Sequence, residues 1–272
     1  MNAKGLQKLL ISTTKAQQRL LNKKFLSYIR TKQRFYKNVT INEDKGKYFI
    51  QLDGKNVKTP LRNDLYAPTQ KLASIVASEW SSQKQTILAH QMHMTSLCNT
   101  CIDNPRKRTK EDMIHDALSF LNSDTLCART PIEESEHTAK MQSEKWDPVL
   151  HWFSKRFDVE IVSSTDIFGF EQPEMTMLKM KQYLSKLSRW QLEGLEFSVD
   201  SVKSFIIPFA VIENYTTINE AIYLARLEVN LQIEKWGSVE WYHDIEKENQ
   251  LAHMSAGVLF YQLCSESFDD EL

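Results

Sequence analysis

The residues of this chain whose types and spacing could do chemistry lie closest together between positions 90 and 101. His90 and His93 form a His-x-x-His pair, and Cys98 and Cys101 form a Cys-x-x-Cys pair. Imidazole nitrogen and thiolate sulfur are ligands that zinc takes in tetrahedral sites. The chain has no second Cys-x-x-Cys pair, and one pair alone specifies zinc loosely. We therefore interpret both cysteines as packed apolar residues, and keep a small metal-dependent enzyme using this His/Cys cluster as the alternative.

His243 and Asp244 are a second candidate, for a metal phosphohydrolase. That chemistry needs further His and Asp ligands on neighbouring helices, and none stands out, so a capping or surface role is the better interpretation. The chain has no Gly-x-Ser-x-Gly, no phosphate-binding loop and no His-Glu-x-x-His. We predict no catalytic residue, no metal ligand and no cofactor, and hence a protein that is not an enzyme.

The elements after position 35 begin as strands. Residues 38–41, 48–52 and 55–59 alternate polar and apolar side chains, and Asp53-Gly54 separates the last two runs. Asp-Gly between alternating runs indicates a hairpin, because both residues tolerate positive φ. A helix follows with Thr69 as its N-cap, and it places Leu72, Val76 and Trp80 on one face.

From the break at Asn104-Pro105 onward, the pattern is helical. We predict helices at 110–121, 134–157, 175–186, 187–195, 198–215, 218–236 and 246–264, with Pro148 as a kink or break. The predicted fold class is α+β. A small β-rich N-terminal domain (35–104, antiparallel sheet plus helix) precedes a larger all-α C-terminal domain (105–267).

The predicted helix at 218–236 is apolar on two opposite faces. Such a helix is usually buried between neighbours, so Trp236 is assigned a structural role in the core, as is Trp80 in the N-terminal domain. Trp190 and Trp241 are freer. The functional interpretation of a free tryptophan is an anchor at a protein interface, where Trp is enriched.

Residues 1–34 contain nine Lys and Arg, and the first acid is Glu43. Apolar residues are spread between these charges, as in a mitochondrial targeting segment; a basic tail that contacts nucleic acid or lipid is the alternative. The formal charge of the whole chain is −1, so the chain without residues 1–34 carries about −10, which argues against nucleic acid as a partner.

We find no apolar run of about 18 residues and predict no membrane span. Four scattered cysteines indicate no disulfide framework.

Several short motifs, in the same order, resemble the mitochondrial ATP synthase assembly chaperones that bind the alpha subunit of the catalytic head. The resemblance begins at Arg34-Phe35-Tyr36-Lys37-Asn38-Val39 and runs to about Ser267. Its motifs are Leu52-Asp53-Gly54, Lys58-Thr59-Pro60, Glu79-Trp80 with Gln83, Thr95-Ser96-Leu97-Cys98-Asn99-Thr100, Asp124-Thr125-Leu126-Cys127-Ala128-Arg129, Trp146-Asp147-Pro148, Arg226-Leu227-Glu228 with Gln232, Trp236-Gly237-Ser238-Val239-Glu240, and His243-Asp244.

The resemblance implies a non-catalytic, two-domain protein of the mitochondrial matrix, expected to be a monomer. It would hold a newly imported alpha subunit, prevent its aggregation and hand it to the beta subunit. It also implies a functional acid in the C-terminal domain, for which Glu228 and Glu240 are the matching candidates, and a role for Trp80 in folding. The residues expected to bind the partner are Glu228, Glu234, Glu240, Trp241 and Asp244.

Two positions depart from the family pattern. Val229 stands where the family tends to have a second acid, which leaves open which acid makes the contact. Pro208 stands where a small residue is usual, and proline inside a helix costs about 3 kcal/mol. A bend is therefore expected in the helix that contains it.

Overall fold

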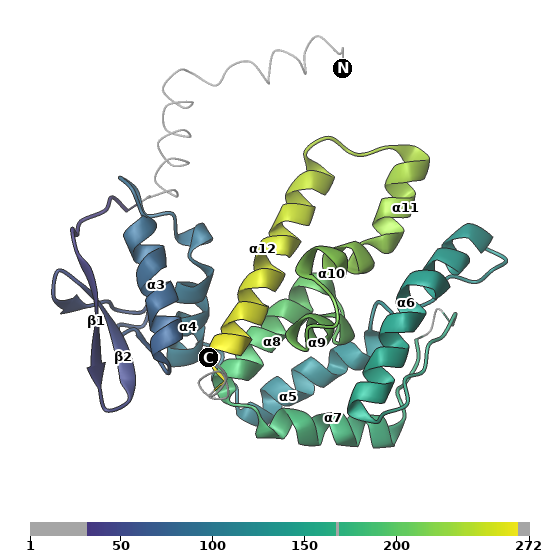
Figure 1. Cartoon of the computed structure of the whole chain (residues 1–272), viewed down its shortest axis with the longest axis horizontal. Helices are drawn as coiled ribbons and strands as arrows, with labels where there is room; N and C mark the ends of the chain where they lie inside the picture. Colours follow the sequence, from purple (N-terminus) through teal and green to yellow (C-terminus); the bar gives the residue numbers. More distant parts are fainter. Residues whose placement is uncertain (1–31, 167–168, 266–272) are drawn as a thin grey trace, which may run out of the picture.

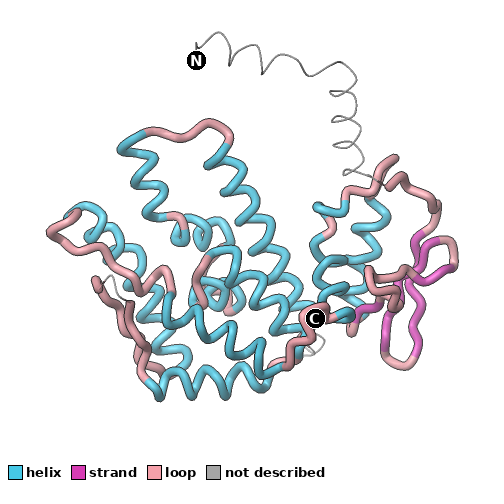
Figure 2. Tube along the Cα trace, turned by 180° about the vertical axis from the view of Figure 1, so that it is seen from behind, coloured by secondary structure: helices cyan, strands magenta, loops and turns pink. Residues whose placement is uncertain are grey.

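A computed structural model describes residues 32–166 and 169–265. The chain folds as two lobes that share the long C-terminal helix (Figure 1). The smaller lobe carries the four-stranded sheet at one end of the molecule, and the larger lobe is built from helices (Figure 2). The predicted α+β fold class is confirmed. The expected targeting segment, residues 1–34, lies outside the described residues except for its last three positions.

The sheet is antiparallel, and its second strand pairs with the other three. Its strands are β1 (Val39–Asp44), β2 (Lys47–Leu52), β3 (Lys55–Asn56) and β4 (Tyr66–Ala67). Asp53 and Gly54 both have positive φ, at 49° and 78°, as the predicted hairpin requires. Lys45 and Gly46, which no prediction covered, form a second turn with positive φ between β1 and β2.

Helix α3 (Gln70–Ser82) packs its buried side chains on the sheet. It begins as predicted, because the Thr69 hydroxyl accepts a hydrogen bond from the Leu72 backbone N–H at 3.2 Å. Trp80 is half-buried near the end of this helix and packs on the core of the lobe. The Tyr36 hydroxyl donates to the Trp80 carbonyl oxygen at 2.7 Å, which fixes the first described residues to α3.

The apolar stretch after position 92 is also a helix, α4 (His93–Asp103), preceded by the short 3₁₀ helix η1 (Ala89–Gln91). No side chain of its own caps its start. Instead, the Glu79 carboxylate on α3 accepts from the backbone N–H groups of Met94 and Thr95, both at 2.8 Å. A carboxylate at a helix N-terminus also interacts favourably with the helix dipole, so this contact locks α4 to α3.

The larger lobe consists of helices around one hydrophobic core. They are α5 (Lys110–Ser119) with η2 (Phe120–Ser123), α6 (Glu136–Phe157), α7 (Glu174–Lys186), α8 (Arg189–Val202), α9 (Ile206–Ile212), α10 (Ile218–Ala225), α11 (Leu227–Trp236) and α12 (Tyr242–Leu263). None of these helices, nor any other in the described ranges, combines the length and hydrophobicity that crossing a bilayer requires.

Neither of the two prolines that were expected to disturb helices ends its helix. Helix α6 runs through Pro148 without ending there. Pro208 is the third residue of α9, where its missing N–H would have had no intrahelical partner in any case. The buried Asp124 carboxylate accepts from the Phe205 and Ile206 N–H groups at 2.7 and 3.0 Å, so the start of α9 is capped from a distant loop.

The helix predicted for residues 198–215 is wrong in its limits, because α8 continues to Val202. Lys203 then ends α8 in the left-handed conformation, with φ 54° and ψ 32°. This longer α8 packs closely along α12, and Gly194 faces Gly257 at the crossing. Both hydrophobic cores draw residues from α12, with Met254 and Val258 in one and Ala256 and Phe260 in the other. The crossing therefore joins the lobes.

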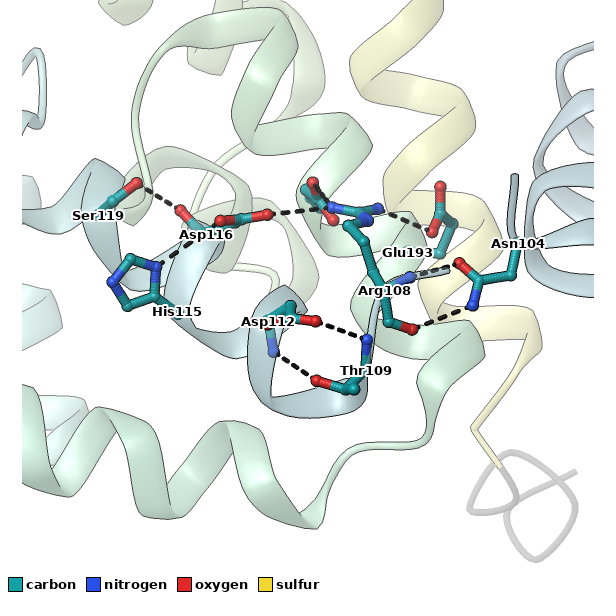
Figure 3. A network of polar contacts seen from close by, with 9 residues as sticks. Asn104, Arg108, Thr109, Asp112, His115, Asp116, Ser119 and Glu193 are labelled. Atoms are coloured by element: carbon teal, nitrogen blue, oxygen red, sulfur yellow. Dashed lines mark hydrogen bonds and ion pairs between the residues drawn. The ribbon is translucent and has the colours of Figure 1, made fainter. Parts of the chain in front are cut away.

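Arg108 adds a polar connection near the junction of the lobes (Figure 3). Asn104, which ends α4, holds the Arg108 backbone through two hydrogen bonds of 3.0 Å. The guanidinium then pairs with Asp116 on α5 at 3.3 Å and with Glu193 on α8 at 3.5 Å, and it also contacts Glu196. The end of α4 is thereby fixed against the helices of the larger lobe.

Candidate functional site: an exposed aromatic tip on the acidic lobe

The stretch 218–236, predicted as one helix, is two helices that meet at Arg226. At this residue φ is −105° and ψ is 12°, outside the helical region, so α10 ends and α11 begins with a changed phase. The prediction that the whole stretch is buried between neighbours is therefore wrong. In α10, Ala221, Ile222 and Leu224 are buried, whereas Leu227 is the only fully buried residue of α11.

Arg226 itself is buried, with 3% of its surface exposed. Its guanidinium donates to Glu246 at 2.7 Å and to Gln250 at 3.0 Å, both on α12, and to the His243 carbonyl oxygen at 3.4 Å. A buried guanidinium needs such partners, because its charge has lost its hydration. Arg226 thereby holds the bases of α11 and α12 together.

Beyond Arg226, α11 and the start of α12 project from the body and are joined by a short loop (Figure 1). We call residues 236–245 the tip. It exposes five large apolar side chains: Trp236 (71%), Val239 (60%), Trp241 (70%), Tyr242 (63%) and Ile245 (57%). The core position predicted for Trp236 is wrong, because the break at Arg226 turns the end of α11 away from the body.

The backbone of the tip is held in an unusual conformation. Gly237 has φ 87° and ψ 163°, a region that only glycine occupies readily. Trp241 has φ 69° and ψ −33°, which costs a residue with a β-carbon of the order of 1–3 kcal/mol. His243 supports the loop, since its Nδ1 atom accepts from the Val239 N–H at 3.1 Å. Packing therefore does not explain Trp241, which is exposed and strained.

Three of the five predicted partner-binding residues, Glu240, Trp241 and Asp244, lie within the tip, and Glu234 is exposed on α11 just before it. Glu228 differs from the other acids. It lies at the start of α11, and its carboxylate accepts from the buried side chain of Gln142 at 2.6 Å. Both acids implied by the resemblance are exposed, and Glu228 differs from Glu240 in having a hydrogen-bond partner on α6.

Val239, Tyr242 and Ile245 belong to the same surface, yet they were not among the residues predicted from the sequence. The sequence did offer one signal, because all three residues lie near Trp241 and shortly after Gly237, a glycine that could end a helix.

The charge of the lobe that carries the tip is also informative. Residues 105–265 contain 17 Lys and Arg against 25 Asp and Glu, so the tip stands on a strongly acidic lobe.

The His/Cys cluster that was the alternative hypothesis does not form a metal site in the described residues. Cys98 is fully buried in the core of the smaller lobe, where desolvation raises the pKa of its thiol well above the usual value. His90 is exposed on η1, while the His93 ring packs on that of His253, with centroids 5.1 Å apart. Within the described ranges, no group of three or more His, Cys, Asp or Glu side chains is placed to hold a metal ion.

Large apolar side chains exposed together are typical of proteins that bind other proteins. Comparison with known proteins gives this class a family. The family described as ATP12 chaperone protein matches residues 33–154. Protein atp12, mitochondrial, of Schizosaccharomyces pombe is 31% identical over 250 residues, which cover 88% of this chain and 85% of that protein. Protein ATP12, mitochondrial, of Saccharomyces cerevisiae is 32% identical over 277 residues, covering 86% and 85%.

Solved structures share the fold. Atp12 from Paracoccus denitrificans superposes with a TM-score of 0.78 at 24% identity, covering 86% of this chain and 98% of that one. The Atu1473 protein from Agrobacterium tumefaciens gives 0.79 at 29% identity, covering 86% of each. The chain belongs to the ATP12 chaperone family. The resemblance drawn from its motifs is therefore confirmed.

Proposed function

We propose that this protein is an assembly chaperone of the mitochondrial ATP synthase that binds the unassembled alpha subunit through the tip. The observation that carries the proposal is the group of five exposed apolar side chains at residues 236–245. A folded protein rarely exposes such a cluster unless it binds something. Because the chain belongs to the ATP12 chaperone family, we take the client to be a subunit of the ATP synthase.

The physical task is to cover an interface that the client exposes before assembly. An unpaired ring subunit presents apolar surface that drives aggregation. A chaperone that binds this surface lowers the concentration of the free form, and a tighter final partner, the beta subunit, then displaces it by mass action. In this scheme Trp236 and Trp241 are the anchors, and Glu234, Glu240 and Asp244 form an acidic rim that selects a basic client surface.

The site of action in this proposal is the mitochondrial matrix, with the basic segment 1–34 as import signal. Two relatives bear the word mitochondrial in their names, and the composition of the segment agrees with that location. We further propose that the free protein is a monomer, whose tip is open to the client.

Co-expression with the alpha subunit tests the proposal directly. We expect the alpha subunit alone to co-purify with the wild-type chain, and Trp236→Ala combined with Trp241→Ala to abolish this while leaving thermal unfolding unchanged, since both rings are exposed. Ile132→Ala combined with Met175→Ala is the matched control, because these side chains are 69% and 62% exposed on the same lobe away from the tip. Retention of the alpha subunit by the double-tryptophan variant would refute the assignment.

A charge reversal examines the acidic rim separately. Glu240→Lys should weaken co-purification and leave the fold intact. Glu248→Lys carries the same change at an exposed position of α12 outside the tip and should have little effect. If Glu240→Lys shifted unfolding rather than binding, Glu240 would be structural.

A further inference from the structure

The smaller lobe contains a cavity of about 1080 Å³ that the tip does not use. It opens between the β2–β3 turn, the loop after β3, the end of α3 and the exposed side of α4. Apolar side chains form part of its wall, among them Phe35, Val57, Trp80 and Met92. Pockets that take ligands usually measure about 300–1,000 Å³, so there is room for several side chains of a bound segment.

Trp80 contributes an apolar surface to this wall, because its side chain is half-buried and lines the cavity. Its indole Nε1–H is itself fully buried and has no hydrogen-bond acceptor among the described residues. The donor is therefore not open to the cavity, and the rest of the ring offers a contact for an apolar side chain of a bound segment.

The mouth of the cavity is basic. Lys32, Lys55 and Arg62 line it and have no ion-pair partner in the part of the chain that is described, while Lys58 pairs with Asp64 at 2.8 Å. The one acid in the lining, Asp53, accepts hydrogen bonds from the Lys37 and Asn38 backbone N–H groups. Residues 32–104 contain ten Lys and Arg against six Asp and Glu. The smaller lobe is thus basic where the larger lobe is acidic.

We propose that this cavity binds a short extended segment of a client polypeptide, with an apolar side chain inserted between Trp80 and Met92 and carboxylates on the basic mouth. Charge complementarity selects an acidic segment, and the polar side chains of Asn56, Ser96 and Asn99 in the lining offer partners for its backbone. The protein then holds its client at two points of opposite charge preference. The inference rests on the proposed function only for the choice of client.

An array of overlapping peptides covering the alpha subunit, probed with the purified full chain, tests the inference. We expect the bound peptides to share an apolar residue next to Asp or Glu, and their binding to weaken as salt rises. Lys55→Glu with Arg62→Glu should lower the affinity for those peptides by about tenfold or more. Lys45→Glu with Lys84→Glu makes the same charge change at exposed positions of this lobe outside the cavity, and should change it little.

A blocking variant gives an independent check. Ser96 is exposed on α4 and lines the cavity, whereas Ser78 is exposed on α3 outside it. Ser96→Trp should abolish peptide binding, and Ser78→Trp should not. The inference is overturned if no peptide binds, if the bound peptides are not acidic, or if Ser96→Trp leaves them bound. Dimerisation of the chain that Lys55→Glu with Arg62→Glu abolishes would also overturn it, by assigning the cavity to a second copy.

The two proposals fail separately. If the tip variants no longer co-purify with the intact alpha subunit, but no peptide binding is changed by the cavity variants, only the cavity proposal is refuted. If cavity-dependent peptides are found but the intact subunit does not co-purify with the wild-type chain, the proposed function falls.

Discussion

Replacing Gly257 by alanine tests the contact between α8 and α12, which joins the two lobes. A β-carbon at Gly257 would lie 2.2 Å from the Ser198 Oγ atom, 2.6 Å from the Gly194 carbonyl oxygen and 2.9 Å from the Ser198 backbone nitrogen. Ordinary contacts begin at 3.4 Å. The hydroxyl can rotate away, but the backbone atoms move only with their helix. Restoring contact with the Gly194 oxygen would therefore separate the helices by roughly 0.8 Å.

Two effects of opposite sign decide the magnitude. Alanine is favoured over glycine inside a helix by about 1 kcal/mol. Overpacking a core costs about 1–3 kcal/mol and occasionally more, and here the clash is with backbone at a crossing that both cores share. We expect the clash to win at the upper end of its range, with a net loss of about 1–2 kcal/mol. For a chain of this size, that loss lowers the melting temperature by about 2–8 °C.

Thermal unfolding followed by circular dichroism measures this loss. Asn249→Ala, an exposed change on α12, is the control and should leave the melting temperature within error or slightly higher. Adding Ser198→Ala to Gly257→Ala should recover less than half of the loss, because the backbone contacts remain. If Gly257→Ala melted at or above the wild-type temperature, helix propensity alone would be acting, and α8 and α12 would not approach this closely.

Three further changes probe other parts of the fold. Trp80→Arg puts a charge beside the core of the smaller lobe and should lower the free energy of unfolding by about 2–4 kcal/mol; wild-type-like urea unfolding would contradict the placement of that side chain. Arg226→Met removes the partner of Glu246 at the base of the tip and should lower the free energy of unfolding by about 2–3 kcal/mol. This is less than the loss expected for a fully buried ion pair, because Glu246 is partly exposed. An unchanged melting temperature would show that this ion pair does not hold α11. Burial raises the pKa of Asp124 from 3.8 to about 6, so the folded state binds this proton more tightly than the unfolded chain does. The free energy of unfolding should therefore fall by roughly 3 kcal/mol as the pH rises from about 4 to 6. Asp124→Asn cannot ionise, so the difference in unfolding free energy between wild type and variant should shrink over that pH range, and parallel pH profiles would refute the assignment.

The sequence by itself determined the local elements, because their signals are local. Asp53-Gly54 specifies its turn through two positive φ angles, and Thr69 begins α3 through its own hydroxyl. Trp241 is exposed, as expected, but Trp190, which the sequence also indicated to be freer, is half-buried and stacks on Phe260. The motifs that resemble a chaperone family are likewise properties of the chain alone, and the comparisons confirm them.

Only the tertiary structure decided what depends on distant partners. Pro208 is tolerated because α9 begins just before it, and the start of α9 at Ile206 is capped by Asp124, 82 positions earlier in the chain. The start of α4 is likewise capped by Glu79 on another helix.

Trp236 shows the limit of periodicity most clearly. Its sequence does show helical periodicity, but the helix is interrupted at Arg226, whose guanidinium donates to Glu246 on α12. Trp236, predicted to lie in the core, therefore lies in the exposed tip. Periodicity describes one helix, whereas burial depends on where the next helix lies.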